Sequence, residues 1–277
     1  MKLISLFVDL IKLMFLRPSA ITKSLYHLVR KEKFRRLCIN NFNLAQGLPM
    51  VDMNDLFEVA EGEVGPIALL NGSSKPTDFF VLKKLAERFG GKCQYLEIGS
   101  WRGESLAVVA NDCEKCTSVS LGEADIRSLG LGDRFIKMQN FFSKDLKNVL
   151  YIEANSLKFD FSSLNQKYDL IFVDGDHSYE GVKSDTHKVF SLLRNEQSVI
   201  VWHDYAMEYE VVNWEVFLGI MEGAPKEARS KIYHIANSLC AIYTNEKLKT
   251  YPSVFPNYPT KKFTVRIKAE KINSKLD

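Results

Sequence analysis

Five short apolar runs alternate with segments of helical periodicity, and this alternation constrains the fold more than any other feature of the sequence. The runs are CQYLEIG (93–99), CTSVSLG (116–122), VLYIEAN (149–155), YDLIFVDG (168–175) and SVIVWHD (198–204). Because the runs are apolar on both faces and helices separate them, we expect a parallel sheet covered on both sides. The segment 231–245 reads as two strands that meet near Asn237 and Ser238, which predicts an antiparallel hairpin at the sheet edge.

The sequence divides into three segments of different character. Residues 77–246 hold the α/β pattern and begin with a predicted helix, for which Thr77 is the expected N-cap and Gly90 the stop signal. Residues 1–76 are predicted to form a helical arm and a connector, and residues 247–277 a C-terminal extension. Both flanking segments are basic while the whole chain carries only +3, so the central segment is acidic.

The opening stretch MKLISLFVDLIKLMFL is apolar, but we do not expect it to span a membrane. Asp9 and Lys12 interrupt it, and Pro18 closes it short of the roughly 20 residues that a spanning helix needs. Helical spacing of its apolar residues predicts an amphipathic helix with Leu3, Phe7, Leu10, Ile11 and Met14 on one side. This helix could pack on the main domain or a second subunit, or lie in a membrane interface beside the basic residues 30–36.

The first predicted strand ends in YLEIGSWRGES, at the edge where doubly wound sheets bind their ligands. Gly99 and Gly103 allow a close backbone approach, and the following helix N-terminus offers free N–H groups. Trp101 stands where a dinucleotide-binding loop needs a small residue, which disfavours a nicotinamide or flavin cofactor. Glu97 would repel a pyrophosphate but suits a ligand that carries an ammonium group.

YLEIGSWRGESLAVVA resembles the first motif of class I S-adenosylmethionine-dependent methyltransferases, particularly the catechol-type branch. FVDGDHSYEGVKSD and VIVWHDY look like the sugar O-methyltransferases of the macrocin and mycinamicin type. The resemblance covers residues 77–245 and implies a Rossmann-like, mostly parallel seven-stranded sheet with an antiparallel last strand. It also implies that S-adenosylmethionine binds at Glu97, Gly99, Ser100, Trp101, Gly103, Ser105, Ser120, Asn155 and Asp174.

The sequence departs from this family pattern at two strand ends. Ser120 stands where relatives usually have an acid that binds the cofactor ribose, and Glu123 could replace it only if the turn is shaped differently. Asn155 stands where relatives often have Asp, although its amide can still hydrogen-bond an adenine amino group. We therefore expect altered ribose contacts beside an unchanged site for the amino-acid end of the cofactor.

Two polar clusters follow neighbouring predicted strands. They consist of Asp174, Asp176 and His177 after the fourth strand, and of His203 and Asp204 after the fifth. One alternative is structural, since Asp174 could end its strand and Asp176 could help to start a helix capped by Ser178. Because adjacent strand tips lie about 5 Å apart, the two clusters could instead converge on one cation.

The resemblance assigns Asp174 and Asp204 to a metal site, with His203 where relatives place another acid or amide. Carboxylates suit Mg²⁺, and a histidine ligand makes Mn²⁺, Fe²⁺ or Zn²⁺ an alternative. His177 occupies the position of the base in macrocin-type enzymes, and an imidazole can accept a hydroxyl proton near neutral pH. Asp185, about two turns further on, could orient His177 or a substrate hydroxyl, but it is expected to be a solvated acid on the helix face.

These patterns predict a metal-dependent O-methyltransferase that transfers a methyl group from S-adenosylmethionine to a hydroxyl of a sugar, glycan or similar small molecule. The alternatives are a non-methylating, hydroxylase-like enzyme of the same fold group and an inactive binding or scaffold protein.

Five scattered cysteines and the lack of a recognisable cleavage site favour a cytoplasmic protein, with membrane association through the N-terminal helix left open. The basic ends lack an RNA-binding motif, so no nucleic-acid partner is expected, while a helical arm is compatible with a homo-oligomer.

Overall fold

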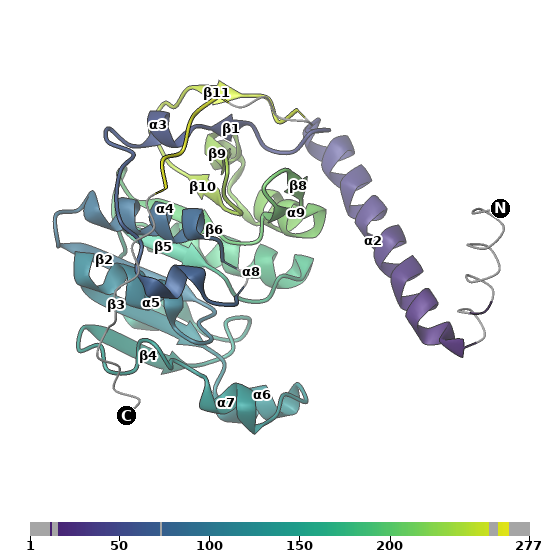
Figure 1. Cartoon of the computed structure of the whole chain (residues 1–277), viewed down its shortest axis with the longest axis horizontal. Helices are drawn as coiled ribbons and strands as arrows, with labels where there is room; N and C mark the ends of the chain where they lie inside the picture. The colour runs from purple at the N-terminus through teal and green to yellow at the C-terminus, as the bar shows by residue number, and fades with distance from the viewer. Residues whose placement is uncertain (1–11, 13–15, 73, 255–259, 266–277) are drawn as a thin grey trace.

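The computed structural model describes residues 12, 16–72, 74–254 and 260–265, and in this part of the chain a nine-stranded sheet carries helices on both faces (Figure 1). The sheet contains β1 (Met50–Val51), β2 (Cys93–Ile98), β3 (Cys113–Ser120), β4 (Val149–Glu153), β5 (Leu170–Val173), β6 (Val199–Trp202), β9 (Ile232–Ile235), β10 (Ala241–Tyr243) and β11 (Thr250–Tyr251). A separate two-stranded ribbon consists of β7 (Ala206–Glu208) and β8 (Val211–Val212).

The α-helices of the described residues are α2 (Pro18–Phe42), α3 (Met53–Leu56), α4 (Pro76–Glu87), α5 (Glu104–Val109), α6 (Glu123–Ser128), α7 (Asp133–Lys137), α8 (Tyr179–Val189) and α9 (Trp214–Gly223). Short 3₁₀ turns occur at η1 (Pro66–Leu69), η2 (Ala110–Asp112), η3 (Phe161–Leu164), η4 (Phe190–Leu192) and η5 (Lys226–Lys231).

The strand order is β11-β1-β9-β10-β6-β5-β2-β3-β4. From β4 to β6 all neighbours are parallel, and β10 runs antiparallel to both β6 and β9. The predicted mostly parallel, Rossmann-like sheet with an antiparallel last strand is therefore confirmed.

The sheet extends beyond the seven expected strands. The two-residue strands β1 and β11 continue it on the outer side of β9, so the β9–β10 hairpin does not form the sheet edge that we expected. These strands come from the connector and from the C-terminal extension. The domain boundaries at residues 77 and 246 stay a prediction, although each flanking segment supplies one short strand to the sheet.

Alternate residues of the central strands enter two separate cores, because successive side chains of a strand point to opposite faces. Leu96 and Ile171 pack on one face with residues of α8 and α9. Tyr95 and Phe172 pack on the other face with residues of α4 and α5. Since every residue of β2 and β5 is buried, polar side chains that face solvent are confined to the ends of these strands.

Two predicted element boundaries are wrong. β3 begins at Cys113, three residues before the expected run. α4 begins at Pro76, so Thr77 lies in its first turn and is not the N-cap. Proline suits the first helical position because a backbone N–H there would have no partner. Lys75 is the N-cap, and its backbone N–H donates to the side chain of Asp78.

The N-terminal helix α2 starts at Pro18 and runs to Phe42, six residues beyond the basic run at residues 30–36. The amphipathic helix predicted for residues 3–14 lies outside the described residues, apart from Lys12. Among the described residues, no helix combines the length and the apolar character needed to cross a membrane.

Two glycines of α9 allow it to pack closely against α8. A Cβ atom at Gly219 would lie 2.8 Å from Cβ of Val182 and 3.0 Å from the carbonyl oxygen of Tyr179. A Cβ atom at Gly223 would lie 2.5 Å from the carbonyl oxygen of Lys183. Side chains cannot approach this closely, so the packing of α8 on α9 requires glycine at both positions.

Gly219→Ala tests this packing by the sign of its effect. Helix propensity alone would stabilise the variant by about 1 kcal/mol, whereas the close contact with α8 should destabilise it by about 2 kcal/mol. Urea unfolding measures the difference. Gly132→Ala is the control, because no heavy atom lies within 4 Å of its added methyl group, and its effect should stay below about 0.5 kcal/mol. A Gly219→Ala variant more stable than the wild type would contradict the packing.

Candidate active site

The predicted site residues gather at the carboxyl ends of the parallel strands, around a cavity of about 780 Å³. Glu97 and Gly99 come from the end of β2, Ser120 from β3, Asn155 from the loop after β4, and Asp174 from the end of β5. The cavity is also lined by Ser100, Trp101, Gly103, Ser105, Asp176 and His177. A volume of this size suits a cofactor or a drug-sized ligand.

The glycines of the first loop bring its backbone against neighbouring segments. Gly99 has a φ of +91°, and a Cβ atom there would lie 2.2 Å from the carbonyl oxygen of Asp174. Gly103 has a φ of +78°, and a Cβ atom there would lie 2.1 Å from Oγ of Ser143. Both positions need glycine for conformation and for space, and Gly99 thereby brings the ends of β2 and β5 together.

Glu97 lies at the floor of the cavity with only 1% of its surface exposed. Burial raises the pKa of its carboxyl to about 7, although hydrogen bonds from Ser105 and Tyr95 favour the ionised form. The hydroxyl of Tyr95 donates to Oε2 at 2.7 Å. A cationic group of a ligand that reaches Glu97 would therefore contact a carboxylate with few other charged partners.

The remaining wall of the cavity is largely apolar. Trp101 stacks on Phe135 with ring centroids 4.6 Å apart, and the wall continues through Leu121, Ile126, Leu129 and Leu131. Ser120 faces this space, whereas Glu123 pairs with Arg127 on the surface of α6 and does not line the cavity. Asn155 also lines it, with its side-chain oxygen accepting the backbone N–H of Leu157 at 3.0 Å.

Asp174, His177 and Asp204 converge at one end of the cavity. Each offers a ligand atom that lies within 4.8 Å of the other two. Nε2 of His177 is 3.1 Å from Oδ2 of Asp204, and the side chain of His177 is 52% exposed. The two polar clusters of the sequence therefore meet, and the histidine stands on the solvent side of the carboxylates.

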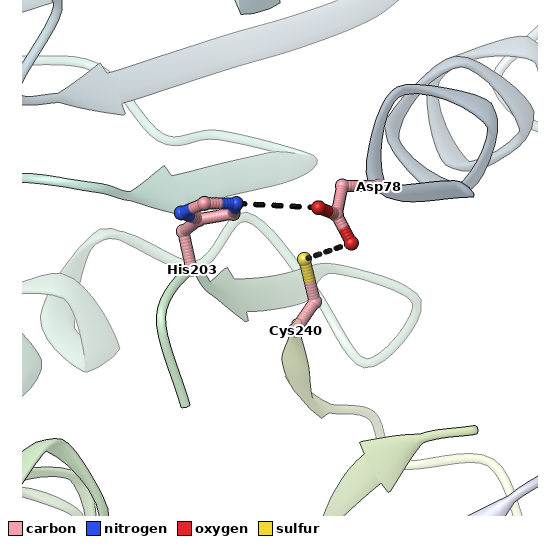
Figure 2. A group of neighbouring side chains, drawn as sticks. All are labelled: Asp78, His203 and Cys240. Atoms are coloured by element: carbon pink, nitrogen blue, oxygen red, sulfur yellow. Dashed lines mark hydrogen bonds and ion pairs between the residues drawn. The ribbon is translucent and has the colours of Figure 1, made fainter. Parts of the chain in front are cut away.

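His203 lies behind these carboxylates and is almost fully buried. Nδ1 is 3.3 Å from Oδ1 of Asp174 and 3.2 Å from Oδ1 of Asp204, while Nε2 is 3.4 Å from Oδ2 of Asp78 (Figure 2). Burial opposes protonation, but the three carboxylates outweigh it and raise the pKa of His203 well above its usual value. Both ring nitrogens of His203 thus face carboxylate oxygens. His203 contacts Asp174 and Asp204 but is not one of the three residues whose ligand atoms converge.

Asp78 holds this histidine from the far side and was not recognised in the sequence. It accepts the backbone N–H groups of Lys75 at 2.6 Å and Leu239 at 2.8 Å, and the thiol of Cys240 lies 3.8 Å from Oδ1 (Figure 2). One buried carboxylate therefore connects the start of α4, the β9–β10 turn and the tip of β6. An acid at the third position of a helix usually signals only a cap, so the pattern gave no hint of this second role.

Two further acids have structural contacts. Asp176 accepts the backbone N–H of Ser178 at 2.9 Å and its hydroxyl at 2.6 Å, while Ser178 caps α8 as expected. Asp185 has no exposed surface, so the expected solvated acid is wrong. It accepts the hydroxyl of Ser156 at 3.1 Å, and burial raises the pKa of its carboxyl to about 6. Asp185 lies on the buried side of α8, and its position in the sequence did not predict this.

Asp78→Asn should destabilise the fold by about 3 kcal/mol, because an amide cannot accept from both backbone N–H groups and from His203. Chemical unfolding of the two proteins gives the difference. Asp125→Asn is the matched control, since Asp125 occupies the same third position of α6 and is only partly buried. Equal losses in the two variants would show that Asp78 acts only as a helix cap.

Glu97 predicts a pH dependence of stability in the absence of ligand. Its pKa of about 7 in the folded chain exceeds the ordinary 4.5, so the folded state binds more protons between these values and loses stability as the pH rises through them. The wild type should lose about 3 kcal/mol more than Glu97→Gln between pH 5 and pH 8. Urea unfolding at both pH values checks this, with the exposed Glu58→Gln as control. Identical pH profiles for wild type and Glu97→Gln would contradict it.

Comparison with known proteins places part of the chain in a described domain family. Residues 96–205 match the family model described as a methyltransferase domain. A search of curated proteins gave no match.

Similar solved structures include the O-methyltransferase NovP, at 12% identity and a TM-score of 0.47, with 64% of this chain and 84% of that chain covered. A putative caffeoyl-CoA O-methyltransferase from Staphylococcus aureus shares 18% identity at a TM-score of 0.41, covering 69% and 90%. The N-methyltransferase NodS from Bradyrhizobium japonicum WM9 shares 16% identity at a TM-score of 0.39, covering 61% and 93%.

The matched residues 96–205 contain both polar clusters and the first glycine loop, and this loop and the cluster of Asp174, Asp176 and His177 line the cavity. Residues 96–205 of the chain therefore form a methyltransferase domain.

Proposed function

We propose that this enzyme is a metal-dependent O-methyltransferase that acts on a hydroxyl of a sugar, glycan or similar small molecule. The observation that carries the proposal is the convergence of Asp174, His177 and Asp204 within 4.8 Å at the end of the cofactor cavity. This placement brings two carboxylates and an imidazole to the point where a methyl acceptor would meet the cofactor.

The chemistry of this group fits a divalent ion. Two carboxylates are the usual protein share of a Mg²⁺ site, which leaves positions for water and for substrate oxygens. Asp204 holds a left-handed backbone conformation with a φ of +54°, and such strain in a non-glycine residue is typical of functional positions. We propose that Asp174 and Asp204 hold the ion. His203 would then position them rather than bind it, contrary to its place among the expected ligands, because both its nitrogens face carboxylates.

The cavity also fits S-adenosylmethionine. Glu97 offers a buried carboxylate for the amino group, and the apolar wall beside Trp101 and Phe135 offers a slot for an aromatic ring. Ser100 lines the same space, and its buried hydroxyl could donate to a bound ligand. We propose that Ser120 and Asn155 replace the acidic contacts that relatives use at the corresponding strand ends.

In the proposed mechanism, His177 accepts the proton of the acceptor hydroxyl. Its imidazole is half exposed, which makes it accessible to a substrate, and Asp204 orients it from 3.1 Å. The metal ion, when bound, would lower the pKa of the hydroxyl. Glu97 and the apolar wall would fix the cofactor so that its methyl group lies in line with the acceptor oxygen, which is a matter of positioning.

The choice of a sugar or glycan acceptor rests on the likeness of DGDHSY and HDY to the macrocin type. All five cysteines are free and buried, which supports our proposal of a cytoplasmic enzyme. A homo-oligomer stays a prediction.

Calorimetry tests the metal and the base separately. Wild type should bind both S-adenosylhomocysteine and Mn²⁺, and Asp204→Asn should weaken Mn²⁺ binding at least tenfold because it removes one charged ligand. His177→Gln should bind Mn²⁺ as the wild type does but form methylated product about 100-fold more slowly. Product formation is measured as S-adenosylhomocysteine release with a panel of free sugars and methyl glycosides.

Asp125→Asn, on α6 and not among the residues that line the cavity, serves as the control and should change neither quantity. Wild type that binds S-adenosylhomocysteine but no Mn²⁺ would refute metal dependence. Weaker Mn²⁺ binding by His177→Gln would make His177 a ligand instead of the base.

A further inference from the structure

The N-terminal half of α2 carries an apolar stripe that no other part of the described structure covers. Leu25, Leu28 and Val29 are 63%, 70% and 63% exposed, and Tyr26 beside them is 57% exposed. Figure 1 shows α2 extending away from the body of the protein toward its N-terminal end. Isolated exposed apolar residues are common, but several along one side of a helix indicate an interaction surface.

This stripe faces away from the contact that fixes α2 to the body. There, the guanidinium of Arg30 pairs with Glu215 of α9, with Nε 2.9 Å from Oε2. Phe34 and Cys38 are buried against α9, and the thiol of Cys38 lies 3.6 Å from the carbonyl oxygen of Trp214. Leu25 precedes Phe34 by about two and a half helical turns, so the two side chains leave opposite sides of α2.

Basic residues surround the stripe. Residues 17–36 contain Arg17, Lys23, Arg30, Lys31, Lys33, Arg35 and Arg36 against one acid, Glu32. Lys23, Lys31 and Lys33 are exposed. The body has the opposite charge, because the basic ends sum to more than the +3 of the whole chain. An anionic surface would therefore attract α2 and repel the rest of the molecule, which sets the orientation of binding.

We propose that α2 binds an anionic lipid surface, with Leu25, Leu28 and Val29 in the acyl boundary and the neighbouring lysines and arginines against the phosphate headgroups. A lipid surface offers apolar and anionic groups side by side, which is the combination that this helix presents. Pairing of two copies through the same stripe would bring two basic helices together, and their repulsion opposes it. The proposal does not depend on the identity of the methyl acceptor.

Co-sedimentation of the full-length protein with vesicles tests this surface. Wild type should bind vesicles that contain phosphatidylglycerol at least tenfold more tightly than vesicles of phosphatidylcholine alone, and high salt should remove the difference. Leu25→Ser with Leu28→Ser should lose at least tenfold in binding because the apolar contact is removed. Lys31→Glu with Lys33→Glu should lose the preference for phosphatidylglycerol.

Val59→Ser with Leu69→Ser is the matched control, because these residues are 60% and 79% exposed on the body, and it should bind as the wild type does. Binding of S-adenosylhomocysteine confirms that each variant is folded. Wild type that does not sediment with anionic vesicles, or a Leu25/Leu28 variant that binds them normally, would overturn the proposal. Light scattering that shows a dimer dissociated by the Leu25/Leu28 change, without vesicle binding, would assign the stripe to a second copy.

Discussion

Three carboxylates surround the imidazole of His203, and the arrangement of the carboxyl edge depends on this contact. Asp78 approaches from α4, Asp174 from β5 and Asp204 from the end of β6. Asp78 is buried and the side chains of Asp174 and Asp204 are 22% and 19% exposed, and three acids around one ring would repel one another without a cation between them. The histidine supplies that charge from inside the protein, and it leaves Oδ2 of Asp204 in contact with Nε2 of His177.

At this carboxyl edge of the sheet, the buried acid Glu97 and the accessible base candidate His177 lie in different surroundings. Glu97 is buried at the cavity, where exclusion of water strengthens a contact to a cationic ligand. His177 stands at the outer end and remains accessible. Gly99 links the two parts, because only its missing side chain allows the backbone of β2 to lie against Asp174. A change at this glycine would therefore disturb both the part of the site around Glu97 and the part around Asp174.

Some of this could be predicted from the sequence, and the limits have physical causes. Strand runs such as 168–175 are apolar on both faces, so their buried, parallel arrangement follows from composition. Strands β1 and β11 have two residues each, which is too short for any periodic signal. Asp185 has the spacing of an exposed helical acid, but the turn of α8 buries it. Asp78 looks like a helix cap, and its contacts beyond that cap come from segments more than 120 residues away.

The sequence alone determined the class of the fold, the strand ends that carry chemistry, and the residue types available there, because these depend on local periodicity and on short motifs. Only the tertiary structure decided which of those residues contact one another. It placed His177 with Asp174 and Asp204 and set His203 behind them. The reason is that side chains on neighbouring strand tips compete for the same few partners. The buried Asp78 of α4 contacts Nε2 of His203, which leaves Nδ1 to face Asp174 and Asp204.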